Sequence, residues 1–406
     1  MSKKRIELFS NGQNKGLSFQ KVSAAVLLSG LIFVAGVQAG KGNFSPVTTK
    51  FDSQKNLPAN LDYTSVESVY DELRAKYDGN LEVDKLMDGL KKGLVAASGD
   101  PYTEFMSAKE AKEFNEQLSG SFEGIGAELG KDKDAVIIVA PIANMPAAKA
   151  GLMPKDIISK IDGKSAIGLS VEEARNKIRG PKATQVTLTI IRGEEELTFK
   201  ITRDTINIPS VESKTLEGNV GYIKISRFSE DTAGLTQKAA AGFKSSGVKS
   251  VVLDLRGNPG GYLESAVDVS SLWLQDKTIL TERRDGTVIK TYKSRGTATL
   301  LGVPTVVLVD EGSASASEIT AGALRDNKVA TLLGVKSFGK GSVQQPEQLS
   351  DGALLKVTIA RWFTPAGKNI DKEGITPDQK VERTVDDYKA GKDPQLDAAV
   401  SKLKTL

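Results

Sequence analysis

Two continuous apolar runs, SVVLDL at residues 250–255 and VPTVVLVD at residues 303–310, set the strongest limit on the fold of this 406-residue chain. Neither run alternates as a half-exposed strand does, so each predicts a strand buried on both faces, as in a parallel sheet covered by helices. Helical patterns alternate with strand patterns from about Asn207 onward. The sequence therefore predicts an α/β domain whose functional residues lie in the turns that follow its strands.

Two residue types are missing, because the chain contains no cysteine and no histidine. The absence of cysteine excludes a thiol nucleophile, disulfides and thiolate metal sites. The absence of histidine removes the usual general base and the commonest metal ligand. A hydrolase with this sequence must activate its nucleophile with Lys, Asp, Glu or Tyr, and we expect neither a metal site nor another cofactor.

Basic residues are concentrated at the start of the chain. Lys and Arg exceed Asp and Glu by 55 − 51 = 4, and residues 1–39 alone carry five basic residues against one Glu. The rest is balanced, so we expect no nucleic-acid partner. The apolar run at residues 22–39 predicts a secretory signal cleaved after Ala39 or a retained membrane anchor. In either case the working part of the protein lies outside the cytoplasm.

Changes of pattern divide the chain into six predicted parts. Helical periodicity begins near Tyr63, short strand patterns replace it near Ser119, and alternating strands and helices follow. The apolar faces of the helical unit could also pair two copies of the chain. The predicted parts are a signal peptide or anchor (1–40), a linker (41–60), a helical unit (61–118), a β-rich domain (119–205), an α/β core (206–385) and a C-terminal tail or helix (386–406).

Lys340 ends a G-V-K-S-F-G-K sequence at residues 334–340, which matches the first seven positions of a phosphate-binding P-loop. The eighth position of a P-loop is Ser or Thr, which holds magnesium, and here it is Gly341. Pro346 makes a poor start for the helix that a P-loop requires. We therefore predict no nucleotide site.

The same lysine completes an S-x-x-K pattern with Ser337, as in penicillin-recognising enzymes. In those enzymes the Ser and the Lys share one helix face, whereas Gly339 and Gly341 argue against a helix here. The companion S-D-N and K-T-G motifs are also missing. This interpretation is weak.

A third interpretation pairs Lys340 with a serine upstream. Residues 306–327 read as a buried strand, a turn of small residues and a helix, with Ser315 in the turn. A serine at such a turn is exposed at the sheet edge, and the first amides of the helix point toward what it attacks. Ser315 and Glu318 also fit a capping box at the start of an ordinary helix. Taken alone, the segment favours the capping box.

Residues 119–204 resemble a PDZ domain in FEGIGAEL at 122–129 and in MPAAKAGLMPKDIISKIDGK at 145–164. The resemblance implies that a peptide adds as a strand to the sheet edge and that its C-terminal carboxylate meets backbone N–H groups. Glycines let such amides converge on an anion without an intervening Cβ. The residues implied for this carboxylate loop are Glu123, Gly124, Ile125 and Gly126.

Nearly all of the chain after Tyr63 resembles the C-terminal processing peptidases, or tail-specific proteases, of peptidase family S41. The resemblance implies a mixed α/β serine peptidase core of the ClpP/crotonase-like type, with an inserted PDZ domain and an N-terminal helical unit. It rests on the PDZ segment and on four further segments, which are LDLRGNPGG (253–261), GSASASEITAGALRDN (312–327), SFGKGSVQ (337–344) and ARWFTPAGKNI (360–370).

The resemblance also implies roles for individual residues. Ser315 is the nucleophile, Lys340 is the general base 340 − 315 = 25 positions later, and Gln344 supports the lysine. A lysine with its ordinary pKa near ~10.4 is a poor base at neutral pH, so it must be buried enough to lower that pKa. The amide of Ala316 donates to the oxyanion together with one amide of the NPGG turn, that of Gly261, with Gly260 left open. We expect Glu318 and Asp326 to be supporting residues, and Arg256 to orient the turn by pairing with a carboxylate.

The sequence thus predicts a serine endopeptidase outside the cytoplasm that binds protein C-termini or apolar tails through its PDZ domain and cleaves by an acyl-enzyme mechanism. Its partners would be peptide substrates, the membrane through its N-terminal segment, and a second copy in a homodimer. The alternative is a PDZ-bearing binding protein that has lost catalysis. Ser315, Lys340 and Gln344 are all present, which favours the enzyme.

Overall fold

The computed structural model describes residues 57, 58 and 60–405. The predicted signal or anchor and most of the predicted linker lie outside these residues. Among the described helices, none has the length and apolar character needed to cross a bilayer. The chain divides into two units, Met1–Leu81 and Glu82–Leu406. The first contains helix α2 (Thr64–Lys76), with Glu67 in its first turn and Arg74 in its last, as the helix dipole favours.

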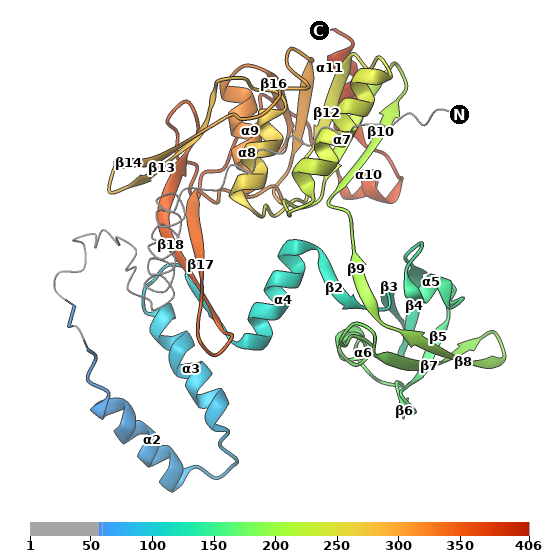
Figure 1. Ribbon diagram of the computed structural model, residues 1–406, viewed down its shortest axis with the longest axis vertical. Helices are drawn as coiled ribbons and strands as arrows, with labels where there is room; N and C mark the ends of the chain where they lie inside the picture. Colours follow the sequence, from blue (N-terminus) through green and yellow to red (C-terminus); the bar gives the residue numbers. More distant parts are fainter. Residues whose placement is uncertain (1–56, 59, 406) are drawn as a thin grey trace, which may run out of the picture. The chain divides into compact units, whose positions relative to one another are not determined.

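The second unit contains a six-stranded sheet, drawn at the top of Figure 1. Its order is β10-β11-β12-β15-β16-β19, and every neighbouring pair is parallel except β10 with β11. The strands are β10 (Val211–Leu216), β11 (Val220–Ile225), β12 (Ser250–Asp254), β15 (Thr305–Val309), β16 (Ala330–Gly334) and β19 (Gln379–Lys380). The helices of this part are α7 (Thr232–Ser245), α8 (Leu263–Ser271), α9 (Ala316–Asp326), α10 (Val385–Lys389) and α11 (Pro394–Leu403).

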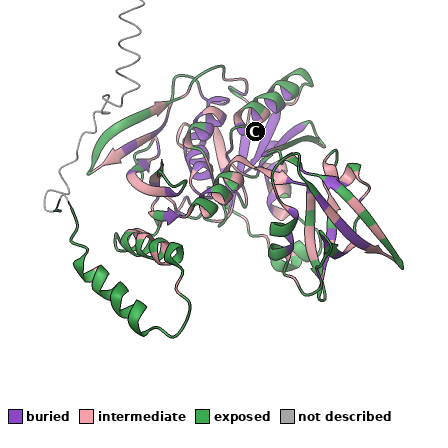
Figure 2. Cartoon of the chain, turned by 60° about the horizontal axis from the view of Figure 1, so that its bottom comes forward, coloured by how far each residue is buried: buried purple, intermediate pink, exposed green. Residues whose placement is uncertain are grey.

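The two apolar runs form the middle of this sheet, and every residue of β12 and β15 is buried. Leu253 and Val307 pack in a cluster with residues of α7, α8 and α9, whereas Val252 and Val306 pack with residues of α11. Helices therefore cover both faces, which is why these strands are apolar on both sides. Figure 2 shows the buried residues concentrated in these strands and the helices beside them. The predicted mixed α/β class is confirmed.

A second, antiparallel sheet is built around the long strand β18 (Leu354–Phe363). Strand β18 pairs with β1 (Glu104–Met106), β13 (Thr278–Arg284) and β17 (Ser342–Gln348), and β13 pairs with β14 (Thr287–Lys293). The sequence predicted helices alone for residues 61–118, so β1 was not foreseen. A three-residue strand carries too little periodicity to be recognised, and here its pairing with β18 determines the structure.

Two helices flank β1 in the second unit, α3 (Val83–Ala96) and α4 (Ala108–Ser119). Lys91 of α3 pairs with Asp351 near the start of β18, at 2.8 Å. Helix α4 begins with a capping box between Ser107 and Glu110, and its Ala111 and Phe114 pack against Met106 and Leu354. This segment is therefore attached to the same sheet as the residues around Lys340.

The β-rich part has its own core, which contains Ile138, Ile158 and Leu188. Its sheet runs β3-β4-β5-β7-β8, with β6 paired to β5, and β2 pairs with β9 in a separate ribbon. Its strands are β2 (Ser121–Gly124), β3 (Ala127–Asp132), β4 (Ala135–Pro141), β5 (Ile157–Ile161), β6 (Lys164–Ser165), β7 (Gln185–Arg192), β8 (Glu195–Thr202) and β9 (Asp204–Asn207). Its helices are α5 (Pro146–Lys149) and α6 (Val171–Ile178).

Candidate active site

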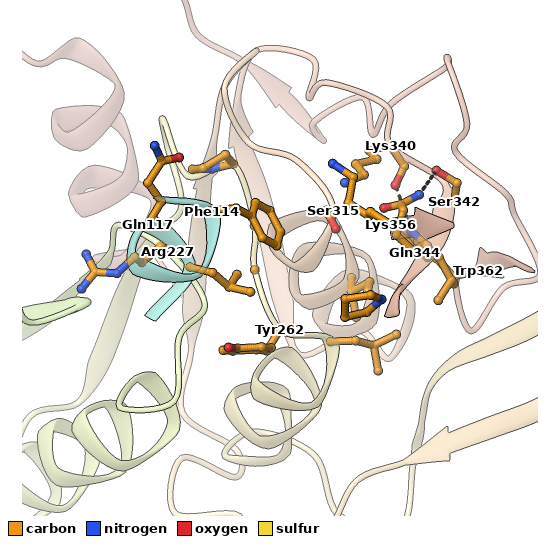
Figure 3. A pocket seen from close by; sticks show the side chains of 18 residues that line it. Phe114, Gln117, Arg227, Tyr262, Ser315, Lys340, Ser342, Gln344, Lys356 and Trp362 are labelled. Atoms are coloured by element: carbon orange, nitrogen blue, oxygen red, sulfur yellow. Dashed lines mark hydrogen bonds between the residues drawn. The ribbon is translucent and has the colours of Figure 1, made fainter. Parts of the chain in front are cut away.

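A cavity of about 340 Å³ contains the side chains of Ser315, Lys340 and Gln344 in its wall, together with Gly260 and Gly261 (Figure 3). These residues follow three neighbouring parallel strands, because the glycine turn comes after β12, the serine after β15 and the lysine after β16. Residues after the carboxyl ends of adjacent parallel strands meet at one edge of the sheet. The fold thus brings together residues that are up to 344 − 260 = 84 positions apart.

Ser315 connects β15 to α9 in a strained backbone conformation, with φ 53° and ψ −113°. An ordinary N-cap residue lies in the β region, whereas a non-glycine residue outside the favoured regions costs about 1–3 kcal/mol. The Ser315 amide donates to Glu318 Oε2 at 2.8 Å, which is one half of the capping box. The strain and the exposure to the cavity are typical of a nucleophile at a strand-to-helix turn, and a simple cap does not account for them.

The turn after β12 is held by Asn258, whose side chain is fully buried. Its Oδ1 accepts a hydrogen bond from the Gly260 amide at 2.9 Å, and its Nδ2 donates to the Ile225 carbonyl at 2.8 Å. Its own carbonyl accepts from the Ala314 amide at 3.0 Å and from Ser317 Oγ at 2.9 Å. Asn258 therefore joins the glycine turn to the segment that carries Ser315. The sequence indicated the turn but gave this asparagine no role.

Glycine is required at both positions of this turn. A Cβ on Gly260, at φ 101°, would lie 2.8 Å from Ser315 Cβ, and one on Gly261, at φ 144°, would lie 2.0 Å from the Phe228 carbonyl oxygen. The Gly260 amide is occupied by Asn258. Among the described residues, neither the Gly261 amide nor the Ala316 amide has a hydrogen-bond partner. Two N–H groups are thus free to donate beside Ser315.

Lys340 lies between β16 and β17 and is partly buried. Its Nζ forms no ion pair or hydrogen bond within the described part of the chain, and it lies over the Tyr102 ring, 5.5 Å from the ring centroid. Burial lowers the pKa of the Lys340 amine, as does the charge of Lys356, whereas Glu318 and Asp100 act in the opposite direction. The net effect is a pKa below the ordinary value, as the chemistry of a lysine base requires.

Glu318 connects the serine and lysine segments through a carboxylate that is almost completely buried. Its Oε1 accepts from Ser337 Oγ at 2.6 Å and from the Gly339 amide at 2.7 Å, and its Oε2 accepts from the Ser315 amide and, at 3.0 Å, from the Lys340 amide. Burial raises the pKa of Glu318, against the lowering effect of these hydrogen bonds. Each hydrogen bond to this carboxylate comes from Ser337 Oγ or from a backbone amide, as expected for a supporting residue.

Gln344 lies in strand β17 and also lines the cavity. Its Nε2 donates to Ser342 Oγ at 2.7 Å, the dashed line in Figure 3, and to Thr358 Oγ1 at 3.4 Å. No hydrogen bond from Gln344 to the Lys340 amine is present among the described residues. Its support of the lysine remains a prediction, and the amide oxygen is the atom left to provide it.

Ser337, the serine of the S-x-x-K pattern, is buried and absent from the cavity wall. Its Oγ donates to Glu318 and accepts from the Ile375 amide at 2.7 Å. Residues 335–341 form no helix. The geometry required by the S-x-x-K interpretation is therefore missing, and Ser337 belongs to the frame that holds Glu318.

Arg256 pairs with two carboxylates near the glycine turn. It contacts Asp254 Oδ2 at 2.6 Å, and it contacts both oxygens of Asp393, just before helix α11, at 2.8 and 2.9 Å. The expected pairing is present, and it attaches the C-terminal helix to the strand that precedes the turn. The other expected supporting residue, Asp326, accepts from the Ala366 amide and does not line the cavity.

The rest of the cavity wall is largely apolar. Leu263, Ile319, Val343 and Trp362 line it from the core, and helix α4 contributes Phe114 together with Gln117 and Leu118. Figure 3 shows Phe114 on the α4 side and Trp362 beside Gln344. A wall of this kind can hold an apolar group of a ligand. Sequence reasoning missed the contribution of α4, because no local pattern reveals a contact with residues some 200 positions away.

The predicted carboxylate loop is divided between a strand and a turn. Glu123 and Gly124 end strand β2, where they pair with Thr205 and Asp204, and Ile125 and Gly126 follow before β3. The carbonyl of Ile125 accepts from the Ala147 amide at 2.7 Å, and that of Gly126 from the Ile142 amide at 2.9 Å. In the described structure, the amides of Ile125 and Gly126 have no hydrogen-bond partner.

The described residues contain no cluster of three or more side chains suited to a metal ion. The chemistry available in the cavity is that of an unpaired amine, a strained serine and two free backbone amides.

Comparison with known proteins identifies two domains in the chain. A model described as peptidase family S41 matches residues 219–381, and a model described as a PDZ domain matches residues 137–192. A CtpA-like serine protease of Staphylococcus haemolyticus is 38% identical over 378 residues, which are 91% of this chain and 75% of the relative. The carboxy-terminal processing protease CtpA of Bacillus subtilis is 39% identical over 390 residues, 94% of this chain and 79% of the relative.

The fold is also found in a crystal structure. An S41 protease from Bacteroides fragilis, at 17% identity, aligns with 86% of this chain and 99% of its own with a TM-score of 0.53. This likeness concerns the fold alone, whereas the two relatives extend over most of the sequence. The chain therefore belongs to the carboxy-terminal processing proteases of peptidase family S41, which are serine peptidases, and it carries the PDZ domain that the sequence predicted.

Proposed function

We propose that the protein cleaves peptide bonds with a Ser315–Lys340 dyad. The observation that carries this proposal is the Lys340 amine, which has a lowered pKa and no charged partner in the described structure, and which shares a cavity with Ser315. The chain has no histidine to act in its place. Ser–Lys pairs are a variant of the serine-protease triad.

In the first step, Ser315 Oγ attacks the carbonyl carbon of the substrate and the neutral Lys340 amine takes the hydroxyl proton. The amides of Gly261 and Ala316 donate to the oxyanion that forms. The Lys340 ammonium then gives its proton to the leaving nitrogen, and the C–N bond breaks to leave an ester on Ser315. Water, deprotonated by Lys340, hydrolyses the ester and restores both groups. Gln344 orients the amine through its amide oxygen.

The PDZ domain would select the substrate. A C-terminal carboxylate would accept from the free amides of Ile125 and Gly126, at the end of the segment that begins with Glu123 and Gly124, and the peptide would add as a strand. Its tail would then be delivered to the cavity. We place the enzyme outside the cytoplasm because of the basic and apolar pattern in residues 1–39. The exposed Met87, Leu90 and Leu94 of α3 fit the predicted pairing of two copies.

Cleavage of a peptide that ends in an apolar tail tests the function. We expect Ser315→Ala and Lys340→Ala each to lower turnover by about 10⁴-fold or more. A fluorophosphonate should label the wild type at Ser315, identified by mass spectrometry, and should leave Ser315→Ala unlabelled. A peptide with an amidated C-terminus should show a higher KM. If the wild type bound the tail without cleaving any peptide, the inactive binding protein would replace this proposal.

A further inference from the structure

The turn at residues 100–103, which joins α3 to β1, lies beside the dyad although it precedes the PDZ domain in sequence. Asp100 fixes its shape, since Oδ1 accepts from the Tyr102 amide at 3.3 Å and Oδ2 accepts from Thr103 Oγ1 at 2.6 Å. These local hydrogen bonds are typical of an Asx turn. The model of peptidase family S41 matches residues 219–381, so this turn lies outside the residues that the model matches.

Two contacts attach the turn to the residues around Lys340. Strand β1 pairs with β18, and the Thr358 amide of β18 donates to Thr103 Oγ1 at 3.1 Å. Thr358 Oγ1 accepts in turn from Gln344. Thr358 is therefore hydrogen-bonded both to Thr103 in the turn and to Gln344 in the cavity wall. These two hydrogen bonds fix the position of the turn relative to the wall.

Tyr102 is the residue of this turn that reaches the lysine. The Lys340 Nζ lies over its ring, 5.5 Å from the centroid. Tyr102 is partly buried and is not among the residues that line the cavity. Its ring therefore lies beside the amine without forming part of the cavity wall. Burial and the carboxylates of Asp371, Glu318 and Asp100 raise the pKa of Tyr102, so the phenol stays neutral.

We propose that Tyr102 is a positioning residue for Lys340, whose ring closes the side of the amine away from the cavity, excludes water there and directs Nζ toward Ser315. The inference rests on the proposed function, because it assigns Lys340 the role of base. It also means that the peptidase core alone lacks one of the groups that surround the Lys340 amine. The segment before the PDZ domain supplies this group, the ring of Tyr102.

Two effects of the ring on the amine oppose each other. The face of an aromatic ring attracts an ammonium, but a centroid distance of 5.5 Å is near the outer limit of about 6 Å for that interaction. Exclusion of water disfavours the ammonium, and burial is the largest cause of the lowered Lys340 pKa. The other groups that face the amine are Lys356 of β18, which favours the neutral form, and Glu318 and Asp100, which favour the charged form. Removal of the ring should therefore raise the pKa.

The test uses the full chain with Tyr102→Phe, Tyr102→Leu and Tyr102→Ala. For each variant, kcat/KM on a fluorogenic peptide and the rate of Ser315 labelling by a fluorophosphonate are measured as a function of pH. We expect Tyr102→Phe to keep the wild-type profile because it keeps the ring. In Tyr102→Ala the acidic limb of both profiles should move to higher pH by about one unit, with an approximately tenfold loss at neutral pH.

The leucine of Tyr102→Leu fills part of the volume of the ring, so the acidic limb of its pH profile should lie between those of the Phe and Ala variants. This variant also tests the inference if the alanine variant does not fold. A loss that is equal at every pH, with the limb unmoved in both Leu and Ala variants, would overturn the inference and leave Tyr102 a structural role. A Phe variant that behaves like Ala would assign the effect to the hydroxyl and overturn it as well. Full activity in Lys340→Ala would instead defeat the proposed function itself.

Discussion

In the described residues, the cavity and the predicted carboxylate loop of the PDZ domain both contain backbone amides without hydrogen-bond partners, but different contacts hold the two sites in place. In the cavity, buried polar side chains hold the neighbouring amides, as Asn258 holds Gly260 and Glu318 holds Ser315. A Cβ on Gly261 would meet backbone atoms of Phe228. In the PDZ loop, a Cβ on Gly126 would meet side-chain atoms of Met145 and Ile206.

The difference matches the two tasks. An oxyanion exists only during the reaction, in the tetrahedral intermediate and the transition states around it, and donors that are already fixed stabilise it without reorganisation. In the cavity, contacts with backbone atoms and with buried polar side chains hold the donor amides in place. A peptide carboxylate is a stable ligand at the end of tails that vary in sequence. A loop packed against the side chains of Met145 and Ile206 can adjust to different tails more easily than a loop packed against backbone. We therefore expect variants in the cavity to lower kcat and variants in the loop to raise KM.

Gly261→Ala should have the largest effect among the variants that leave the dyad intact. Its Cβ would lie 2.0 Å from the Phe228 carbonyl oxygen, so the turn must shift and the Gly261 amide must leave its place. We expect kcat on a peptide without a recognition tail to fall about 10²–10³-fold. Gly257→Ala is the control, because it adds a similar strain at a φ of 65° but its Cβ meets no atom within 4 Å, and it should retain most of kcat. Equal losses in both variants would contradict the assignment of the donor.

Gly126→Ala should separate binding from catalysis. The added Cβ would lie 2.5 Å from Met145 Cβ, so the loop must move and its free amides with it. Loss of hydrogen bonds to a carboxylate, at about 1.5–3 kcal/mol, should raise KM for a tailed peptide about tenfold or more while kcat stays near that of the wild type. Gly168→Ala is the matched control, because its φ of 82° is also positive but its Cβ meets no atom within 4 Å. If untailed peptides were affected equally, the loop would belong to the catalytic frame.

Lys356→Met should change the pH profile by a smaller amount. Lys356 pairs with Glu104 at 2.9 Å, and its charge helps to lower the pKa of Lys340. Without that charge the Lys340 pKa rises, so the neutral amine becomes scarcer and the acidic limb of kcat/KM moves to higher pH. We expect a few-fold loss at neutral pH and recovery at high pH. Lys356→Arg keeps the charge and should leave the acidic limb of the kcat/KM profile at its wild-type pH. A shift in both variants would instead indicate that the packing of the Lys356 side chain, and not its charge, is responsible.

Ser337→Ala should have the smallest effect on catalysis. The substitution removes one hydrogen bond from buried Glu318 and leaves the Ile375 amide without its acceptor. We expect the free energy of unfolding to fall by about 1–3 kcal/mol, measured by urea denaturation, and kcat to remain within a few-fold of the wild type. Loss of fluorophosphonate labelling in this variant would instead revive the S-x-x-K interpretation.

The residues with local signatures were accessible to sequence reasoning. The runs at 250–255 and 303–310 predicted buried strands because a strand covered on both faces needs no polar side. The relation between Ser315 and Lys340 came from family resemblance, and the lack of histidine made it chemically consistent. What the sequence could not reveal are contacts between distant segments, such as Tyr102 beside Lys340 or Phe114 in the cavity wall, and side-chain hydrogen bonds such as those of Asn258.

The pairing of β1 with β18 also sets the order in which the enzyme is completed during synthesis. A chain leaves the ribosome with its N-terminus first, so residues 100–118 emerge after more than 200 fewer residues have been synthesised than β18 requires. Until Leu354–Phe363 has been made, β1 has no partner strand and Trp362 is missing from the cavity wall. Ser315 and Lys340 are both translated before this strand. A nascent chain therefore contains Ser315 and Lys340 before its cavity is complete, and we expect it to become competent only after β18 has been made.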